Sequence, residues 1–179
     1  MQIIQSERLD LISINPQTMQ AFVEGDIELA SQIAGFQVPP EADMPVGALK
    51  MWIRQLGKDP SLQPWLIRAI VLREKNLMVG NIGFHTKPDP PYLAELAPGG
   101  VEFGYGVFAS YRRQGFAKEA AAALMEWAQL TAQIGVFILS ISPTNLPSTK
   151  MALSMGFEKF SSHIDPLDGP EDIYRYVIE

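Results

Sequence analysis

The chain contains 179 residues, 47% of them hydrophobic and 19% charged, a composition that excludes wholesale disorder. The length fits one domain, or at most two small ones, and we expect a single domain over residues 1–179. Its 14 Lys and Arg residues and 20 Asp and Glu residues give a formal net charge of −6, which argues against nucleic-acid binding through phosphate neutralisation. The absence of cysteine excludes disulfides, thiolate nucleophiles and cysteine-bound zinc, and the two histidines, His85 and His163, lack ligand-like spacing, so we expect no metal.

The amino-terminal residues do not resemble a targeting segment, because charges occur within the first ten residues and no continuous apolar stretch is present. No apolar run in the sequence approaches the ~20 residues that span a bilayer. The sequence therefore predicts a cytoplasmic protein without a membrane partner.

The first sixty or so residues predict one strand and three helices. An imperfect alternation of apolar residues over 9–14 indicates a short strand. Two helices follow, over 16–24 and 27–34, and each is preceded by a capping side chain and closed by a glycine. A third helix is expected over 48–56.

Strands dominate the next part of the chain. Two β-rich runs, 65–73 and 77–86, are separated by three polar residues and predict a hairpin. A proline-rich loop follows, and then a strand over 101–108 that contains Gly104 and Gly106. Glycines inside a strand weaken it and often mark a bulge or the close approach of a ligand.

The last third of the chain alternates helices and strands. Apolar residues recur at three- and four-residue intervals over 116–131, which predicts the longest helix. A strand over 136–141, a helix over 149–155 and two strands over 157–164 and 173–178 complete the chain. This order of elements predicts a mixed α/β domain.

The tight turn before the long helix is the most informative segment. The unpaired N–H groups of a first helical turn, with the positive end of the helix dipole, suit a phosphate or pyrophosphate. Gly115 lets the backbone approach such an anion, and Arg112, Arg113 and Lys118 add positive charge. No GxxxxGK[ST] loop is present, and the strand glycines do not open a helix, so the familiar nucleotide loops do not fit.

Residues 112–117, Arg-Arg-Gln-Gly-Phe-Ala, fit the pattern [R/Q]-x-x-G-x-[G/A] and resemble the acyl-CoA pyrophosphate loop of the GNAT N-acetyltransferase superfamily. The surrounding motifs match as well: E-x-G-Y on the preceding strand, then S-x-x-N-x-x-S, and M-G-F at 155–157. The segment S-E-R-L-D-L at 6–11 resembles the opening strand of the ribosomal-protein N-terminal acetyltransferases (RimJ/RimL-like).

This resemblance implies the GNAT fold, an α/β (α+β) domain with a central, mostly antiparallel mixed sheet of about six to seven strands and helices on both faces. It also implies that the strands near 101–108 and 136–142 splay, so that the pantetheine arm of acetyl-CoA lies between them. The cofactor-binding residues implied by position are Tyr105, Gly106, Val107, Arg112, Arg113, Gln114, Gly115, Phe116, Ala117, Lys118 and Asn145.

The chemistry implied by the resemblance is direct attack of a primary amine on the acetyl-CoA thioester, and the absence of cysteine agrees with direct transfer in a ternary complex. Glu102 occupies a position where some relatives hold a general base. Many relatives have a tyrosine acid seven residues after the asparagine, but this chain has Ala152 there. Ser148 is therefore the substitute acid candidate, unless water protonates the leaving thiolate.

Each candidate also has a structural interpretation. Glu102 can lie on an exposed strand face, Asn145 and Ser148 can be helix caps, and we interpret His85 as a structural residue rather than a base. The alternative function is a catalytically silent acyl-CoA-binding or interaction module with the same fold, which Ala152 favours. The acceptor amine, a protein N-terminus or a small molecule, stays open, although the net negative charge favours a cationic acceptor. Relatives often dimerise, which allows a homodimer.

Overall fold

The structure is a computed structural model that describes residues 3–166 and 169–178. It divides into two compact units, and the strand β5 (Val101–Val107) and the helix α4 (Phe116–Ala132) contribute to both. Unit 1 consists of Met1–Gly83 and Tyr105–Leu124, and unit 2 consists of Phe84–Gly104 and Met125–Glu179. The expectation of a single domain over 1–179 stays a prediction.

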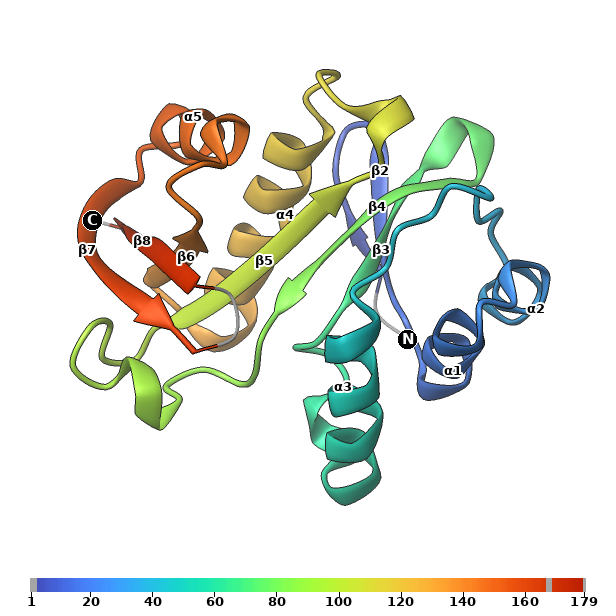
Figure 1. The fold of residues 1–179 in the computed structure, drawn as a ribbon, viewed down its shortest axis with the longest axis horizontal. Helices are drawn as coiled ribbons and strands as arrows, with labels where there is room; N and C mark the ends of the chain where they lie inside the picture. Colours follow the sequence, from blue (N-terminus) through green and yellow to red (C-terminus); the bar gives the residue numbers. More distant parts are fainter. Residues whose placement is uncertain (1–2, 167–168, 179) are drawn as a thin grey trace. The chain divides into compact units, whose positions relative to one another are not determined.

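Unit 1 contains an antiparallel meander in which each strand pairs with the next along the chain. Figure 1 shows how it brings distant segments side by side, because Leu9 lies opposite Leu72 and Ser13 opposite Arg68. Its elements are β1 (Ile4–Gln5), β2 (Leu9–Ser13), β3 (Arg68–Leu72), β4 (Leu77–Phe84), α1 (Pro16–Glu24), α2 (Ile27–Ala34), α3 (Val46–Lys58) and the 3-10 turns η1 (Pro60–Leu62), η2 (Arg73–Lys75) and η4 (Ala109–Tyr111).

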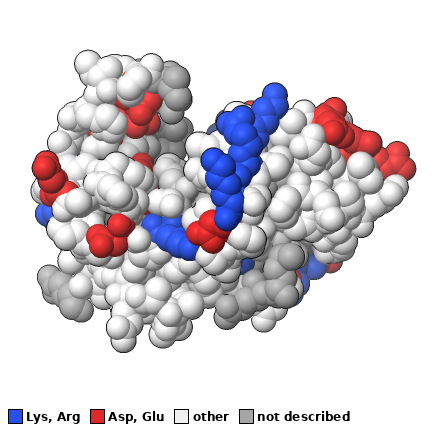
Figure 2. All heavy atoms as spheres, turned by 90° about the horizontal axis from the view of Figure 1, so that it is seen from below, with Lys and Arg blue, Asp and Glu red and all other residues white. Residues whose placement is uncertain are grey.

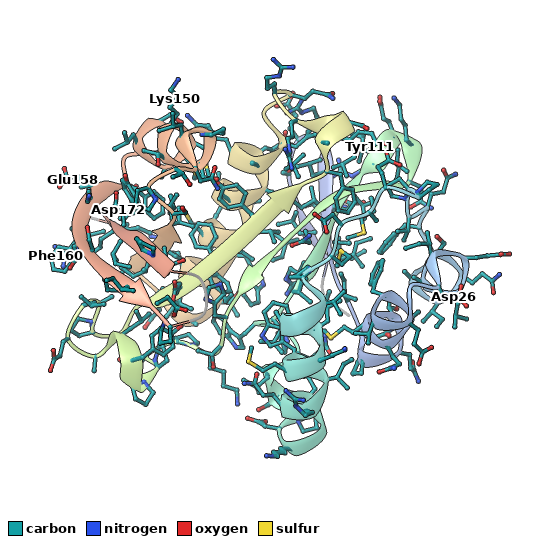
Figure 3. All side chains as sticks on the ribbon, in the orientation of Figure 1. Asp26, Tyr111, Lys150, Glu158, Phe160 and Asp172 are labelled. Carbon is teal, nitrogen blue, oxygen red and sulfur yellow. The ribbon has the colours of Figure 1, made fainter. Side chains whose placement is uncertain are left out.

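Helices α1 and α2 of unit 1 begin and end where the sequence predicts. The side chains of Asn15 and Asp26, the latter labelled in Figure 3, each accept a hydrogen bond from the backbone N–H three residues on. Gly25 and Gly35 end α1 and α2 in the left-handed conformation, both with φ of 76°. The helices pack on one apolar core that includes Met19, Phe22, Leu49, Trp52, Leu56, Leu66, Met78 and Phe108.

Unit 2 is organised around aromatic side chains. The ring of Phe103 on β5 lies 6.2 Å from that of Phe84 and 6.1 Å from that of Phe157, and Trp127 of α4 stacks on Phe84 at 6.3 Å. Its further elements are η3 (Pro91–Leu93), β6 (Val136–Ile141), α5 (Leu146–Ser154), β7 (Glu158–Asp165) and β8 (Gly169–Val177). β6 and β7 both pair with β8 in antiparallel register.

The ladder between β5 and β6 is short. These two strands are parallel, and their register places Val101 opposite Phe137 and Glu102 opposite Ile138. β5 continues to Val107 and β6 to Ile141, so the ladder is confined to the start of both strands. The expected splay requires β5 and β6 to separate soon after they begin, and this short ladder agrees with it.

The fold class implied by the GNAT resemblance is confirmed. The strand order β1-β2-β3-β4-β5-β6-β8-β7 describes a mostly antiparallel mixed sheet. The described residues form eight strands rather than about six to seven, because β1 is only two residues long and such a short strand has no recognisable alternation. α3 also runs past the expected 48–56 at both ends. No helix in the described part of the chain has the length and apolar character needed to cross a membrane.

Candidate functional site

The turn before α4 adopts the conformation that an anion site needs. Arg113 and Gly115 both have left-handed backbone, with φ of 61° and 83°, and α4 begins directly afterwards at Phe116. Alternating conformations of this kind turn successive N–H groups toward one spot, and the helix start adds its unpaired N–H groups. The side chains of residues 112–115 and of Lys118 are exposed, whereas Phe116 is buried.

Arg8, from the turn before β2, braces this loop. Its Nε donates to Glu119 Oε2 at 2.7 Å and its Nη2 donates to the carbonyl oxygen of Gln114 at 3.1 Å. The guanidinium also lies 4.7 Å from the centre of the Phe116 ring. Ser6 Oγ donates to Glu119 Oε1 at 2.6 Å. These four contacts connect the turn before β2 to the loop and to the first turn of α4.

The carboxylate at the centre of this brace is held in its charged form. Burial raises the pKa of Glu119, but the hydrogen bonds from Ser6 and Arg8 and the charge of Arg8 outweigh burial and lower it below its usual value. Sequence reasoning missed this role, although the Ser6 and Arg8 positions of the S-E-R-L-D-L motif carried a usable signal.

The end of β5 is joined to the same loop. Arg112 Nε donates to the carbonyl oxygen of Val107 at 2.9 Å. Tyr105, Gly106 and Val107 are half-buried, in contrast to the fully buried start of β5. The sequence expected the Arg112 charge to serve the anion site, and the structure shows that one of its N–H groups also fixes the end of the strand.

Asn145 and Ser148 lie at the start of α5 in unit 2. Asn145 Oδ1 accepts a hydrogen bond from the Ser148 backbone N–H at 3.2 Å, so the interpretation of Asn145 as a helix cap is confirmed. Ala152, at the position where many relatives have tyrosine, is completely buried in the same helix.

Glu102 is the centre of a second polar cluster, the Glu102 network, which comprises Glu102, His85, Tyr92 and Ser140. Glu102 is only 8% exposed, so its interpretation as an exposed strand residue is wrong. Ser140 Oγ on β6 donates to Glu102 Oε1 at 2.5 Å, and His85 Nδ1 lies 3.5 Å from Oε2. Tyr92, from η3, also forms a side-chain hydrogen bond with this carboxylate.

These partners determine the charge of the network. Burial raises the pKa of Glu102, but the hydrogen bond and positive charge of His85, followed by the hydrogen bonds from Ser140 and Tyr92, hold it below its usual value. Burial, with the charge and hydrogen bond of Glu102, raises the pKa of Tyr92 well above its ordinary range. Glu102 is therefore ionised at neutral pH, while Tyr92 keeps its proton.

The structure brings only some of the sequence candidates together. Within unit 1, residues 105–107 and 112–118 are connected by the Arg112 bond, and within unit 2 the Glu102 network is complete without Ser148. Tyr92 and Ser140 escaped sequence reasoning because neither belongs to a motif. The cofactor and catalytic roles of all the sequence candidates stay predictions.

Comparison with known proteins places this geometry in context. The model of the acetyltransferase (GNAT) domain family matches residues 8–158. The uncharacterized N-acetyltransferase p20 of Bacillus licheniformis is 26% identical over 106 residues. That match covers 59% of this chain and 56% of the relative, so the chain aligns with little more than half the length of this curated protein.

Solved structures share the fold over nearly the whole chain. An acetyltransferase of the GNAT family from Bacillus anthracis has a TM-score of 0.63 and 20% identity, and the match covers 99% of this chain and 98% of that one. RimL, the ribosomal L7/L12 α-N-protein acetyltransferase, in complex with coenzyme A, has a TM-score of 0.67 and 16% identity, with coverage of 99% and 98%.

Proposed function

Because the chain belongs to the GNAT acetyltransferase family, we propose that it transfers the acetyl group of acetyl-CoA directly to a primary amine. The amine nitrogen forms a bond to the thioester carbonyl carbon, the C–S bond breaks, and the thiolate leaves as CoA. The observation that carries the proposal is the braced anion loop before α4, where exposed backbone and basic side chains meet a helix start.

The residues present fit acetyl-CoA as the co-substrate. The loop 112–118 would hold the pyrophosphate through backbone N–H groups, and the half-buried backbone of residues 105–107 would pair with the pantetheine arm. A backbone N–H of this strand would polarise the thioester carbonyl, a contribution commonly worth several kcal/mol. Asn145 would contact the cofactor arm from the start of α5.

Glu102 takes part in activating the amine, and Ser148 is the residue that we assign to protonation of the leaving thiolate. Glu102 is ionised and buried at the start of the β5–β6 ladder, which supports a part in activating the amine. Ser148 stands in the first turn of α5, where its hydroxyl would protonate the departing thiolate. Water would take that part if Ser148 does not.

The acceptor that we favour is a protein N-terminus, with small-molecule amines as the alternative. The structural likeness to RimL, an α-N-protein acetyltransferase, supports this class of acceptor. We also propose that the reaction occurs in the cytoplasm, since acetyl-CoA is made and used inside cells. A homodimer, which the family resemblance allows, remains part of the proposal.

Two measurements test the function. Saturating acetyl-CoA should raise the thermal midpoint by mass action on the native state, whereas ATP should not. Release of free CoA thiol should then depend on an amine, in a panel of peptides with free N-termini, polyamines and amino sugars. Absence of stabilisation by acetyl-CoA would contradict the proposal.

The same panel tests a second candidate function, a catalytically silent acyl-CoA-binding module. Ala152 in place of the usual tyrosine favours it, because a buried methyl group has no proton to give. Binding of acetyl-CoA without CoA release across the whole panel would support this candidate and contradict acetyl transfer.

A further inference from the structure

His85 and Glu102 form a pair in which a buried carboxylate holds an exposed imidazole. The Glu102 side chain is 9% exposed and that of His85 is 44% exposed, and their Nδ1 and Oε2 atoms lie 3.5 Å apart. Their backbones are joined as well, because the His85 N–H donates to the Glu102 carbonyl oxygen at 3.0 Å. The imidazole is therefore anchored at one nitrogen and at its own main chain.

The second nitrogen of His85 lies over the backbone of β5. Side chains alternate along a strand, so Gly104 shares a face with Glu102. A Cβ added at Gly104 would lie 3.1 Å from His85 Nε2, which means that the glycine makes room for this atom. Tyr105, the first residue expected to pair with the pantetheine arm, directly follows Gly104. Nε2 thus lies beside Gly104, one residue along the chain before the segment expected to hold the pantetheine arm.

Glu102 suits the orientation of a neighbouring side chain, whereas His85 suits the acceptance of a proton. The carboxylate of Glu102 already accepts hydrogen bonds from Ser140 and Tyr92 and faces His85 Nδ1, so about three of its roughly four acceptor positions are occupied. A carboxylate at Nδ1 of His85 fixes the tautomer that leaves a lone pair on Nε2. Glu102 and Tyr92 are the titratable groups known to face His85, the first directly and the second through Glu102.

We propose that His85 Nε2 accepts the proton of the acceptor ammonium and that Glu102 is a positioning residue that orients the imidazole. This inference rests on the proposed acetyl transfer. The ammonium loses one proton to Nε2, and the freed amine attacks the thioester carbon. The C–S bond then breaks, a second amine proton passes to the thiolate through the Ser148 hydroxyl or water, and the imidazolium returns its proton to water. The products are the amide, CoA thiol and one proton.

The test compares the wild-type protein with His85→Ala, with and without added imidazole. We expect kcat to fall by about 10²-fold or more, with an unchanged Kd for acetyl-CoA, and imidazole to restore part of the turnover. The matched control is His163→Ala, because His163 is the other histidine of unit 2 and lies 3.7 Å from a carboxylate, that of Glu171. His163→Ala should keep wild-type turnover and show no response to imidazole.

Glu102→Gln separates positioning from proton transfer. The imidazole then loses the carboxylate that orients it but keeps Nε2, so kcat should fall by about tenfold while the Kd for acetyl-CoA stays unchanged. Full turnover by His85→Ala, or a loss that imidazole leaves unchanged, would overturn the proposal for His85 alone. A wild-type protein that binds acetyl-CoA but acetylates no amine would overturn the proposed function and this inference with it.

A second inference comes from α3, which carries a row of three cations. Lys50, Arg54 and Lys58, here called the basic row, follow one another at four-residue intervals and are all exposed. The opposite side of the helix is buried through Leu49, Trp52 and Leu56. Figure 2, seen from the direction in which α3 ends in Figure 1, shows Lys and Arg atoms gathered in an elongated ridge.

The charges of the basic row have no compensating carboxylate within α3. Like charges four residues apart repel, whereas Lys58, in the last turn, lies at the negative end of the helix dipole. Among the described residues, no ion pair or hydrogen bond engages the three side chains. Such a row in a protein of net charge −6 indicates a partner with local negative charge.

The spacing of the row matches an extended peptide. Four residues of helix rise about 6 Å, and two residues of extended chain span about 6.6 Å. We propose that the basic row docks an extended polypeptide segment with acidic side chains at every second residue. The net negative charge of the rest of the protein disfavours nucleic acid and anionic membranes, because these carry charge over a much wider surface.

Direct binding tests this inference independently of any acetyl transfer. The probe is a fluorescent ten-residue peptide with Glu at alternate positions, and its Gln counterpart is the blank. The double variant K50Q/K58Q should weaken binding roughly fivefold at low salt, and K75Q/K150Q, with the same change in net charge, should not. Lys150 points outward from α5 in Figure 3 and is exposed, as is Lys75. Equal binding by K50Q/K58Q, or tighter binding of single-stranded RNA or phosphatidylserine vesicles through these lysines, would overturn the proposal.

Discussion

The loop before α4 and the Glu102 network differ in how they are built. The loop consists of consecutive residues, 112–118, and presents mainly backbone groups. The Glu102 network joins side chains from β5, β6, η3 and the end of β4, which are far apart in the chain. Binding by the loop depends on its backbone conformation. The charge and orientation of the Glu102 carboxylate depend instead on the side chains that contact it.

This difference predicts different sensitivities. The loop should tolerate changes of exposed side chains and fail when its backbone conformation is lost. The Glu102 network should respond to the loss of any one partner through the charge of its carboxylate. Three experiments, from the largest expected effect to the smallest, test these statements.

Gly115→Val tests whether the backbone conformation of the loop is required for binding of acetyl-CoA. A β-branched residue at φ of 83° is strained, and an added Cβ would lie 3.3 Å from Arg8 Nη2. A strain of about 2 kcal/mol would weaken acetyl-CoA binding about thirtyfold, as measured by titration calorimetry. Gly135→Val is the control, because an added Cβ meets nothing within 4 Å there. An unchanged Kd in folded Gly115→Val would contradict a backbone-defined site.

Arg8→Met removes the brace while keeping an apolar stem over Phe116. The hydrogen bonds to Glu119 and to the Gln114 carbonyl are lost, and partly exposed pairs of this kind contribute about 1 kcal/mol. The Kd for acetyl-CoA should rise about fivefold. Lys159→Met breaks an equally short pair, 2.7 Å from Asp172, in unit 2 and should leave this Kd unchanged. If both variants bind alike, the brace has no part in binding.

Glu102→Gln should change how stability depends on pH. The pKa of Glu102 is lower in the folded protein than the value of 4.5 that describes the unfolded chain, so its stabilising contribution is complete above that value. This contribution is lost as the pH falls through the depressed folded-state pKa. The difference in unfolding free energy between wild type and variant, from urea titrations, should therefore narrow from pH 7 to pH 3. Glu126→Gln, an exposed change on α4, is the control, and a constant difference for Glu102→Gln would refute the assignment.

Much of the fold follows from local signals. Asn15, Asp26, Gly25 and Gly35 mark helix ends because caps and left-handed glycines act on their own turn of helix, and these ends are confirmed. The two-residue β1 was missed because its pairing with β2, not its sequence, makes it a strand. The strand expected over 65–73 begins only at Arg68, because the chain before it turns at η1 and Pro64.

The loop before α4 and the Glu102 network also differ in how far the sequence predicted them. The sequence placed Gly115 and its basic neighbours at a helix start, and the structure puts them there. It did not connect Arg8 with Glu119, which are separated by more than a hundred residues. It set His85 aside as structural, because nothing in the sequence indicates that its imidazole lies beside Glu102.

The sequence by itself determined the family, the ends of α1 and α2 and the loop before α4, since each depends on residues that are neighbours along the chain. Tertiary structure alone decided the burial of Glu102, the partners that keep it ionised and the brace provided by Arg8. The physical reason is that capping and backbone conformation are short-range effects. The charge and orientation of a buried side chain depend on whichever groups the fold brings within a few ångströms.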